Sequence, residues 1–145
     1  MGVDIGFYIQ KNVDNKWKDV SLYKDNSNKV EIWRRGSCVT DEVIDCYTFG
    51  LNVNHDEIVD LAISTGWLNN DGNDDEMPPY YAISLSKLKY LANKPGIDIH
   101  DTEEEYIDKK KFFKELVNEI EVYLSFTDDD YIDEDNIRII AFISY

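Results

Sequence analysis

The feature that most constrains the fold is a C-terminal segment, residues 137–145, whose apolar side chains would cover both faces of an extended strand. Side chains of a β-strand point alternately to its two faces. The segment divides into two such sets, which are Ile137, Ile139, Ala141 and Ile143 on one face and Arg138, Ile140, Phe142 and Ser144 on the other. A strand that is apolar on both sides is typical of the interior of a sheet that is covered on both faces. We therefore expect a central strand here, next to the first strand of the chain.

The N-terminal third of the chain has the pattern of short strands separated by turns. Val3, Ile5, Phe7 and Ile9 alternate with other residues, as in a half-buried strand. Clusters of Asn and Asp indicate the reversals that follow. The expected elements are, in order, a strand over 1–10, a turn over 12–16, a strand over 17–23, a turn over 24–28 and a strand over 29–34. We expect these strands to form an antiparallel meander.

Helical signals dominate the remainder of the chain. Asn54 precedes Glu57 by three residues, which resembles a capping box, and the helix that begins there should end near Gly66. The further expected elements are a strand over 80–84, a helix capped by Ser84 or Ser86 that runs to Ala92, and a long helix over 102–126 with apolar residues at intervals of three and four. The predicted fold is α+β: an antiparallel β-sheet of the N-terminal meander plus the C-terminal strand, packed against two or three helices.

Charge is the unusual feature of the composition. The chain has 145 residues, which fits one domain over residues 1–145, and 30 acidic residues oppose 15 basic ones for a net charge of -15. Residues 1–70 carry a net charge of -4 and residues 71–145 a net charge of -11. Such a charge disfavours direct binding to nucleic acid or to an anionic membrane, and it permits a basic protein partner. With no signal peptide and no apolar run near the ~20 residues of a membrane span, we expect a cytoplasmic protein, of its own cell or of a host.

The sequence has no catalytic or metal-binding signature. Its two histidines, His55 and His100, lie in no recognisable motif, and Cys38 and Cys46 are interpreted as packed thiols. Loops that begin at Asp71 or Asp128 lack the Gly that an EF-hand needs at its sixth position, and the Cys and His pairs of a zinc site are absent. We therefore expect a protein without a cofactor or metal that is not an enzyme.

The acidic residues of the C-terminal half are the main candidates for partner binding. Along one side of the long helix they recur at spacings of four and seven, with Lys111 interrupting the stripe, and two acidic loops add to them. Tyrosines beside those loops could serve as interface anchors, although core packing explains Tyr80 and Tyr81 equally well. The candidate partner-binding residues are Asp71, Asp74, Asp75, Glu76, Tyr80, Tyr81, Glu104, Asp108, Glu115, Glu119, Asp128, Asp129, Asp130 and Tyr131. Charge kept only for solubility is the competing interpretation.

The opening Met1-Gly2-Val3-Asp4-Ile5-Gly6-Phe7-Tyr8-Ile9 resembles a group of small phage and prophage proteins that begin Met-Gly-Cys-Asp-Ile-His and continue as an aromatic strand. Val3 and Gly6 replace the Cys and the His of that pattern, so no role of those two residues is carried over. The resemblance covers about twenty residues and implies a phage origin. Acidic proteins of that origin are often inhibitors of host defence, among them the anti-CRISPR proteins. The resemblance thus implies a nucleic-acid mimic bound to a basic surface of a CRISPR or other nuclease component.

Two alternatives stay open. A small-molecule binder, such as a sponge for a nucleotide signal, would need basic residues to meet phosphate. The chain has three arginines, Arg34, Arg35 and Arg138, and the adjacent pair Arg34-Arg35 is the natural candidate. A hydrolase with a non-standard carboxylate site would need two acids that converge in a cleft. The sequence does not fix the oligomeric state, and an exposed strand edge or the region of Trp33 leaves a homodimer open.

Overall fold

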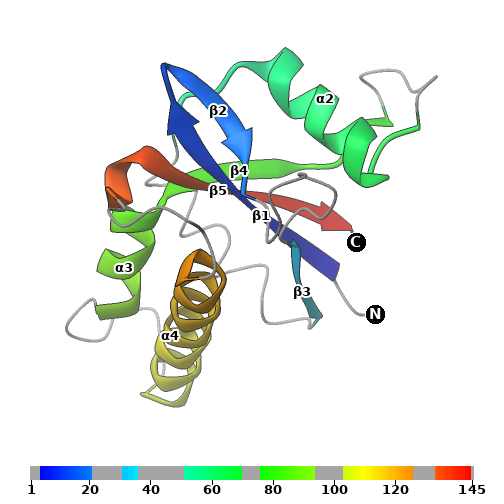
Figure 1. Cartoon of the computed structure of the whole chain (residues 1–145). Helices are drawn as coiled ribbons and strands as arrows, with labels where there is room; N and C mark the ends of the chain where they lie inside the picture. Colours follow the sequence, from blue (N-terminus) through cyan, green and yellow to red (C-terminus); the bar gives the residue numbers. More distant parts are fainter. Residues whose placement is uncertain are drawn as a thin grey trace.

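The computed structural model describes residues 4–20, 31–35, 51–69, 76–93, 103–125 and 133–144, with the backbone alone for Asp4, 31–35 and 103–110. Within these ranges an antiparallel five-stranded sheet is combined with helices (Figure 1). The elements are β1 (Asp4–Val13), β2 (Lys16–Asp19), β3 (Glu31–Arg35), α2 (His55–Thr65), β4 (Tyr80–Ser84), α3 (Leu85–Asn93), α4 (Glu103–Ser125), the 3-10 helix η2 (Glu134–Asn136) and β5 (Ile137–Ser144). This arrangement confirms the predicted α+β fold.

β5 is a central strand, as its two apolar faces predicted. The strands lie in the order β2-β1-β5-β4, and β3 also pairs with β1. β1 and β5 pair antiparallel from Asp4 opposite Ser144 to Lys11 opposite Ile137. The first and last strands of the chain are therefore neighbours, and β4 flanks β5 on its other side.

The second edge of β1 is shared by two short strands. β3 pairs with residues 4–8 of β1, and β2 pairs with residues 10–13. Between them, the backbone N–H of Val20 donates to the carbonyl oxygen of Ile9 at 2.9 Å. Both N-terminal strands thus return to β1, where β2 follows it through a two-residue turn at Asp14 and Asn15, both with positive φ.

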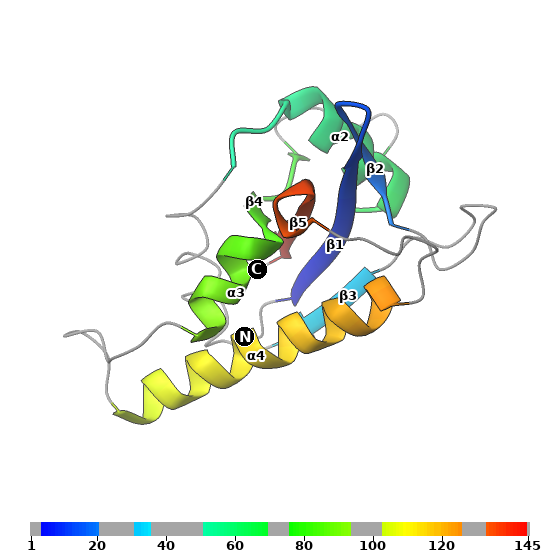
Figure 2. The same cartoon turned by 60° about the vertical axis from the view of Figure 1, so that its left-hand side comes forward.

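Helices cover both faces of the sheet: α2 lies on one side, and α3 and α4 lie on the other (Figure 1, Figure 2). The side chains of β1 and β5 divide accordingly, with Ile5, Phe7, Ile9, Ile137, Ile139, Ala141 and Ile143 in the core beneath α3 and α4, and Tyr8, Ile140 and Phe142 in the core beneath α2. Successive side chains along β1 and β5 therefore belong alternately to two separate hydrophobic cores.

The second face of β1 is more buried than the half-buried strand that the sequence suggested. Tyr8 is 1% exposed and Gln10 is 7% exposed, because α2 and its following turn cover this face. The polar atoms of both side chains form hydrogen bonds with other protein groups. These bonds offset the free-energy cost of burying the polar atoms.

The helix ends follow the predicted capping residues. The Asn54 side chain accepts hydrogen bonds from the backbone N–H groups of Asp56 and Glu57 at 3.0 and 3.4 Å. α2 ends at Gly66, whose φ of 86° is left-handed and suits a residue without a Cβ. Ser84 caps α3, because its Oγ accepts from the backbone N–H of Lys87 at 3.2 Å. The helix predictions for these segments are confirmed.

Gly6 lets a tryptophan lie directly on the sheet. A Cβ added at Gly6 would be 2.8 Å from Cζ2 of Trp67. The Trp67 ring is also 5.7 Å from the ring of Phe142, and its Nε1–H donates to the hydroxyl of Tyr8 at 2.6 Å. A His at this position, as in the phage proteins of similar N-terminus, would not fit beneath Trp67.

We predict that Gly6→Ala lowers the free energy of unfolding by about 1–3 kcal/mol, because the added methyl group overpacks the contact with Trp67. Urea unfolding of the wild type and the variant measures this difference. The same substitution in a Trp67→Ala background should cost much less, since the clashing ring is gone. An equal cost in the two backgrounds would show that Gly6 is needed for another reason.

Candidate functional site

The most unusual side chain of the sheet is Arg138, a cation in the central strand that is only 2% exposed. Its Nε–H donates to Oε1 of Gln10 at 2.8 Å, and its Nη2 lies 3.5 Å from Oε2 of Glu57. The guanidinium also lies over the ring of Trp17, with Cζ 4.4 Å from the ring centroid. These three contacts connect Arg138 of β5 to β1, α2 and β2.

The sheet register places these groups side by side. Gln10 of β1 is opposite Arg138 of β5 on one side and opposite Asp19 of β2 on the other. Its amide is used in both directions, because Nε2 donates to Oδ1 of Asp19 at 3.0 Å while Oε1 accepts from Arg138. Hydrogen bonds thus connect β2, β1 and β5 in turn. The ring of Trp17 of β2 lies against the guanidinium at the end of this series.

Burial lowers the pKa of the Arg138 guanidinium, and the charge of Glu57 followed by that of Asp19 acts in the opposite direction. Arginine starts from so high a pKa that it stays protonated at neutral pH. The structure therefore keeps a positive charge beneath its surface. A guanidinium has five N–H groups, and no acceptor for Nη1 is found among the described residues.

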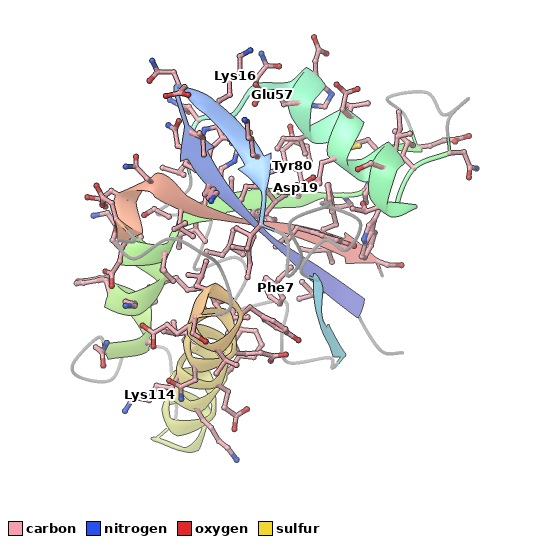
Figure 3. All side chains as sticks on the ribbon, viewed as in Figure 1. Phe7, Lys16, Asp19, Glu57, Tyr80 and Lys114 are labelled. Carbon is pink, nitrogen blue, oxygen red and sulfur yellow. The ribbon has the colours of Figure 1, made fainter. Side chains whose placement is uncertain are left out.

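Arg138 is among the residues that line a recess of about 450 Å³ between the β1–β2 hairpin and α2. Glu57, Asp60, Leu61 and Ser64 line it from α2, where spacings of three and four residues bring side chains to one face of a helix. The hairpin contributes Lys16, Trp17 and Asp19 to the lining, and Figure 3 shows the labelled Lys16 and Glu57 near one another.

Carboxylates outnumber cations in this recess. Asp19, Glu57 and Asp60 face Lys16 and Arg138. Two of the carboxylates have roles already, since Asp19 accepts from Gln10 and Glu57 pairs with Arg138. Asp60 is exposed and, within the described part of the chain, makes no hydrogen bond or ion pair. The recess therefore offers an acceptor that the fold itself does not use.

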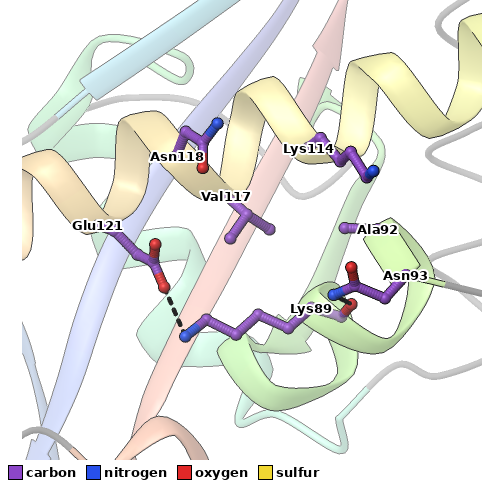
Figure 4. A pocket seen from close by; sticks show the side chains of 7 residues that line it. All are labelled: Lys89, Ala92, Asn93, Lys114, Val117, Asn118 and Glu121. Carbon is purple, nitrogen blue, oxygen red and sulfur yellow. Dashed lines mark hydrogen bonds and ion pairs between the residues drawn. The ribbon is translucent and has the colours of Figure 1, made fainter.

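A second recess of about 350 Å³ lies between α3 and α4 (Figure 4). Lys89 of α3 makes ion pairs with Glu121 of α4 and with Glu134 of η2. Within α3, Asn93 donates through Nδ2 to the backbone carbonyl oxygen of Lys89 at 2.9 Å. The ion pairs of Lys89 hold α3, α4 and η2 together, and we interpret this recess as structural.

The structure describes the predicted partner-binding residues to different extents. Glu76 and Glu115 are exposed, whereas Glu119, Tyr80 and Tyr81 are partly buried. For Glu104 and Asp108 the structure describes only the backbone of α4. The other predicted residues, Asp71, Asp74, Asp75, Asp128, Asp129, Asp130 and Tyr131, lie outside the described residues.

The two tyrosines are used in packing. Tyr80 belongs to the core beneath α2, with its ring 6.3 Å from that of Phe142, and its hydroxyl is 2.7 Å from Nδ1 of His55. Tyr81 packs against the core on the other face of the sheet. Of the two interpretations that the sequence left open for this pair, these contacts favour core packing.

Several carboxylates of the C-terminal half have internal partners. Glu121 and Glu134 share Lys89, and Asp135 accepts from Oγ of Ser86 at 2.6 Å. Glu115 is 4.0 Å from Lys111, the lysine that interrupts the acidic stripe. A continuous anionic surface over the C-terminal half stays a prediction, because most of its acidic loops lie outside the described residues.

The backbone positions of Arg34 and Arg35 are far from that of Arg138. Arg34 is opposite Ile5 in the sheet, whereas Arg138 is opposite Gln10. At about 3.4 Å per residue, their positions differ by roughly 17 Å along β1. Arg35 lies one residue further away, opposite Asp4. A phosphate site built from all three arginines is therefore not supported.

Sequence reasoning missed most of the Arg138 recess, namely Gln10, Trp17, Asp19, Glu57 and Asp60. One signal was available: Arg138 interrupts an otherwise apolar segment, and a charge in such a strand requires partners. The pairing of β1 with β5 could have suggested Gln10 as one of them. Nothing local in the sequence indicates that α2 would supply Glu57.

The described residues contain no group of three or more His, Cys, Asp and Glu side chains that could hold a metal ion. None of the described helices is long and apolar enough to cross a membrane. No protein-family model matches the chain, and no curated protein or solved structure matches it. The phage-type resemblance of the N-terminus thus stays a prediction.

We predict that Gln10→Met lowers the free energy of unfolding by about 2 kcal/mol, because the buried guanidinium loses the acceptor of its Nε–H. In an Arg138→Met background the same substitution should cost far less, since apolar residues replace both partners. A double-mutant cycle by urea unfolding measures the coupling. Equal costs in both backgrounds would contradict the contact.

Lys89→Met should lower the free energy of unfolding at neutral pH by about 1 kcal/mol or less, because its ion pairs are half exposed. Hydrogen bonds to Glu121 and Glu134 raise the pKa of Lys89 above its ordinary value of 10.5. The stabilisation is thus present below that value and is lost as the pH rises through the folded-state pKa.

Thermal unfolding at increasing pH measures this dependence. The difference between wild type and Lys89→Met should disappear in strongly alkaline solution. Lys114→Met is the matched control, because Lys114 lines the same recess but makes no hydrogen bond or ion pair within the described residues. A similar loss in both variants would refute the role of Lys89.

Proposed function

We propose that this chain is a non-enzymatic binding protein that attaches to a basic surface of a partner protein and thereby inhibits it. The partner class that we favour is a host defence protein or another protein that handles nucleic acid, such as a CRISPR or other nuclease component. The chain would occupy the partner's nucleic-acid surface as an acidic mimic, in the cytoplasm of the host cell.

The observation that carries this proposal is the net charge of -15, together with exposed carboxylates that the fold does not use. Asp56 and Asp60 project from α2, and neither side chain makes a hydrogen bond or ion pair within the described residues. Charges of one sign that lack internal partners weaken folding and attract cationic surfaces. A binding role gives that excess a use.

The phage-type N-terminus supports the choice of a defence protein as the partner class. That support comes from resemblance and concerns origin, whereas the charge concerns the mode of binding. The alternative of a nucleotide-binding protein would use the adjacent pair Arg34 and Arg35 on β3, because Arg138 lies too far along the sheet to join them.

The test is binding and inhibition with purified nucleases and other nucleic-acid-handling defence proteins that have basic surfaces. We expect a tight complex at low salt whose affinity falls by about tenfold or more as ionic strength is raised to the physiological range. Double-stranded DNA should compete with the chain. Affinity that is independent of salt, or the absence of any basic partner, would refute the proposal.

Two substitutions on neighbouring positions of α4 provide a matched pair of controls. Glu115→Gln removes an exposed negative charge and should slow association slightly, whereas Lys114→Gln removes an exposed positive charge and should accelerate it. Stopped-flow association rates measure both effects. Changes of the same sign in the two variants would count against electrostatic steering.

A further inference from the structure

We propose that the recess over Arg138 is the part of the surface that receives a single basic side chain, arginine or lysine, from the partner protein. This inference rests on the proposed function and adds a defined contact point to it. The recess combines a cavity of about 450 Å³, an aromatic ring, carboxylates and a buried cation.

The lining suits the two parts of a basic side chain. Trp17 and Leu61 provide apolar surface for an aliphatic stem, and Asp60 and Glu57 provide acceptors for its charged end. Asp60 has no competing contact within the described residues, so its carboxylate is available to a cation. Glu57 is only 3.5 Å from Arg138 and about half exposed, which leaves its second oxygen able to accept.

Arg138 provides a second feature that points to a ligand. It is 2% exposed and lines the recess, yet its Nη1 has no acceptor among the described residues. A buried donor without an acceptor costs free energy, so an oxygen from outside would stabilise it. A peptide supplies such an oxygen in the carbonyl next to its basic side chain. One residue of a partner would then pair with Asp60 through its basic side chain and with Arg138 through its carbonyl oxygen.

The same arginine fixes the walls of the recess. It holds Trp17 through its guanidinium face, Glu57 through an ion pair, and Asp19 indirectly through Gln10. Groups that are already positioned lose less conformational freedom on binding, which strengthens the complex. Arg138 therefore acts as a positioning residue, and Asp60 as the contact residue.

The sign of the charge selects the ligand. A carboxylate or phosphate would meet Asp19, Glu57 and Asp60 in addition to the overall charge of -15, and the charge of Arg138 is already paired with that of Glu57. Lys16 is the single exposed cation among the described lining residues, and it lies at the hairpin turn. A cationic side chain is instead attracted by these carboxylates and by the overall negative charge, even from a distance.

The experiment uses the full chain and a short peptide with one central arginine, compared with the same peptide carrying neutral citrulline at that position. Binding is followed through the NMR signals of the Trp17 indole N–H and the Arg138 Nε–H. We expect the arginine peptide to shift both signals in a saturable manner, and the citrulline peptide to leave them nearly unchanged. Equal effects of the two peptides, or no shift of either signal, would overturn the proposal.

Asp60→Asn and Asp56→Asn form the matched pair of variants, because each removes one exposed charge from α2 and only Asp60 lines the recess. Asp60→Asn should weaken the arginine peptide about five- to tenfold, whereas Asp56→Asn should change its affinity less than about twofold. Equal weakening would mean that cations bind diffusely to the acidic surface. That outcome overturns the recess as a contact point and leaves the proposed function standing, which fails only if no basic partner protein is bound.

Discussion

The burial of β5 on both faces is the constraint on which the rest of the structure depends. Each of its residues from Ile137 to Ile143 is buried, and the strand belongs to the cores on both sides of the sheet. A strand of this kind is stable only if helices cover both faces. That requirement places α2 on one side and α3 with α4 on the other, and it leaves Arg138 beneath the surface with a need for partners. The recess is thus a by-product of the central position of β5.

The sequence predicted the backbone elements well because they follow from local rules. Alternation identified β1 and β5, and the side chains of Asn54 and Ser84 cap the helices that they were expected to cap. The covering of the second face of β1 was not predicted, because it depends on α2 docking over Tyr8. No local pattern encodes the direction from which a helix returns to a sheet.

The candidate site was harder to predict than the fold for the same reason. Its residues come from β1, β2, α2 and β5, and they meet only after the first and last strands have paired. Sequence reasoning looked instead for runs of acidic residues, which are visible without a structure. In the described part of α4 and η2, several of those carboxylates have structural partners such as Lys89. The carboxylates of α2 are spaced along a helix face and form no run, so the sequence indicated a capping role for Glu57 but no site.

β2 and β3 share one edge of β1, and this arrangement also limits how the molecule can associate. These strands have four and five residues, and the contact of Val20 with Ile9 separates them. Short strands rich in charged residues, here Lys16, Lys18, Glu31 and Arg35 among others, give an incoming strand little to pair with. Such an edge discourages a continuous sheet. The described part of this edge is therefore a poor surface for strand pairing between two copies of the chain.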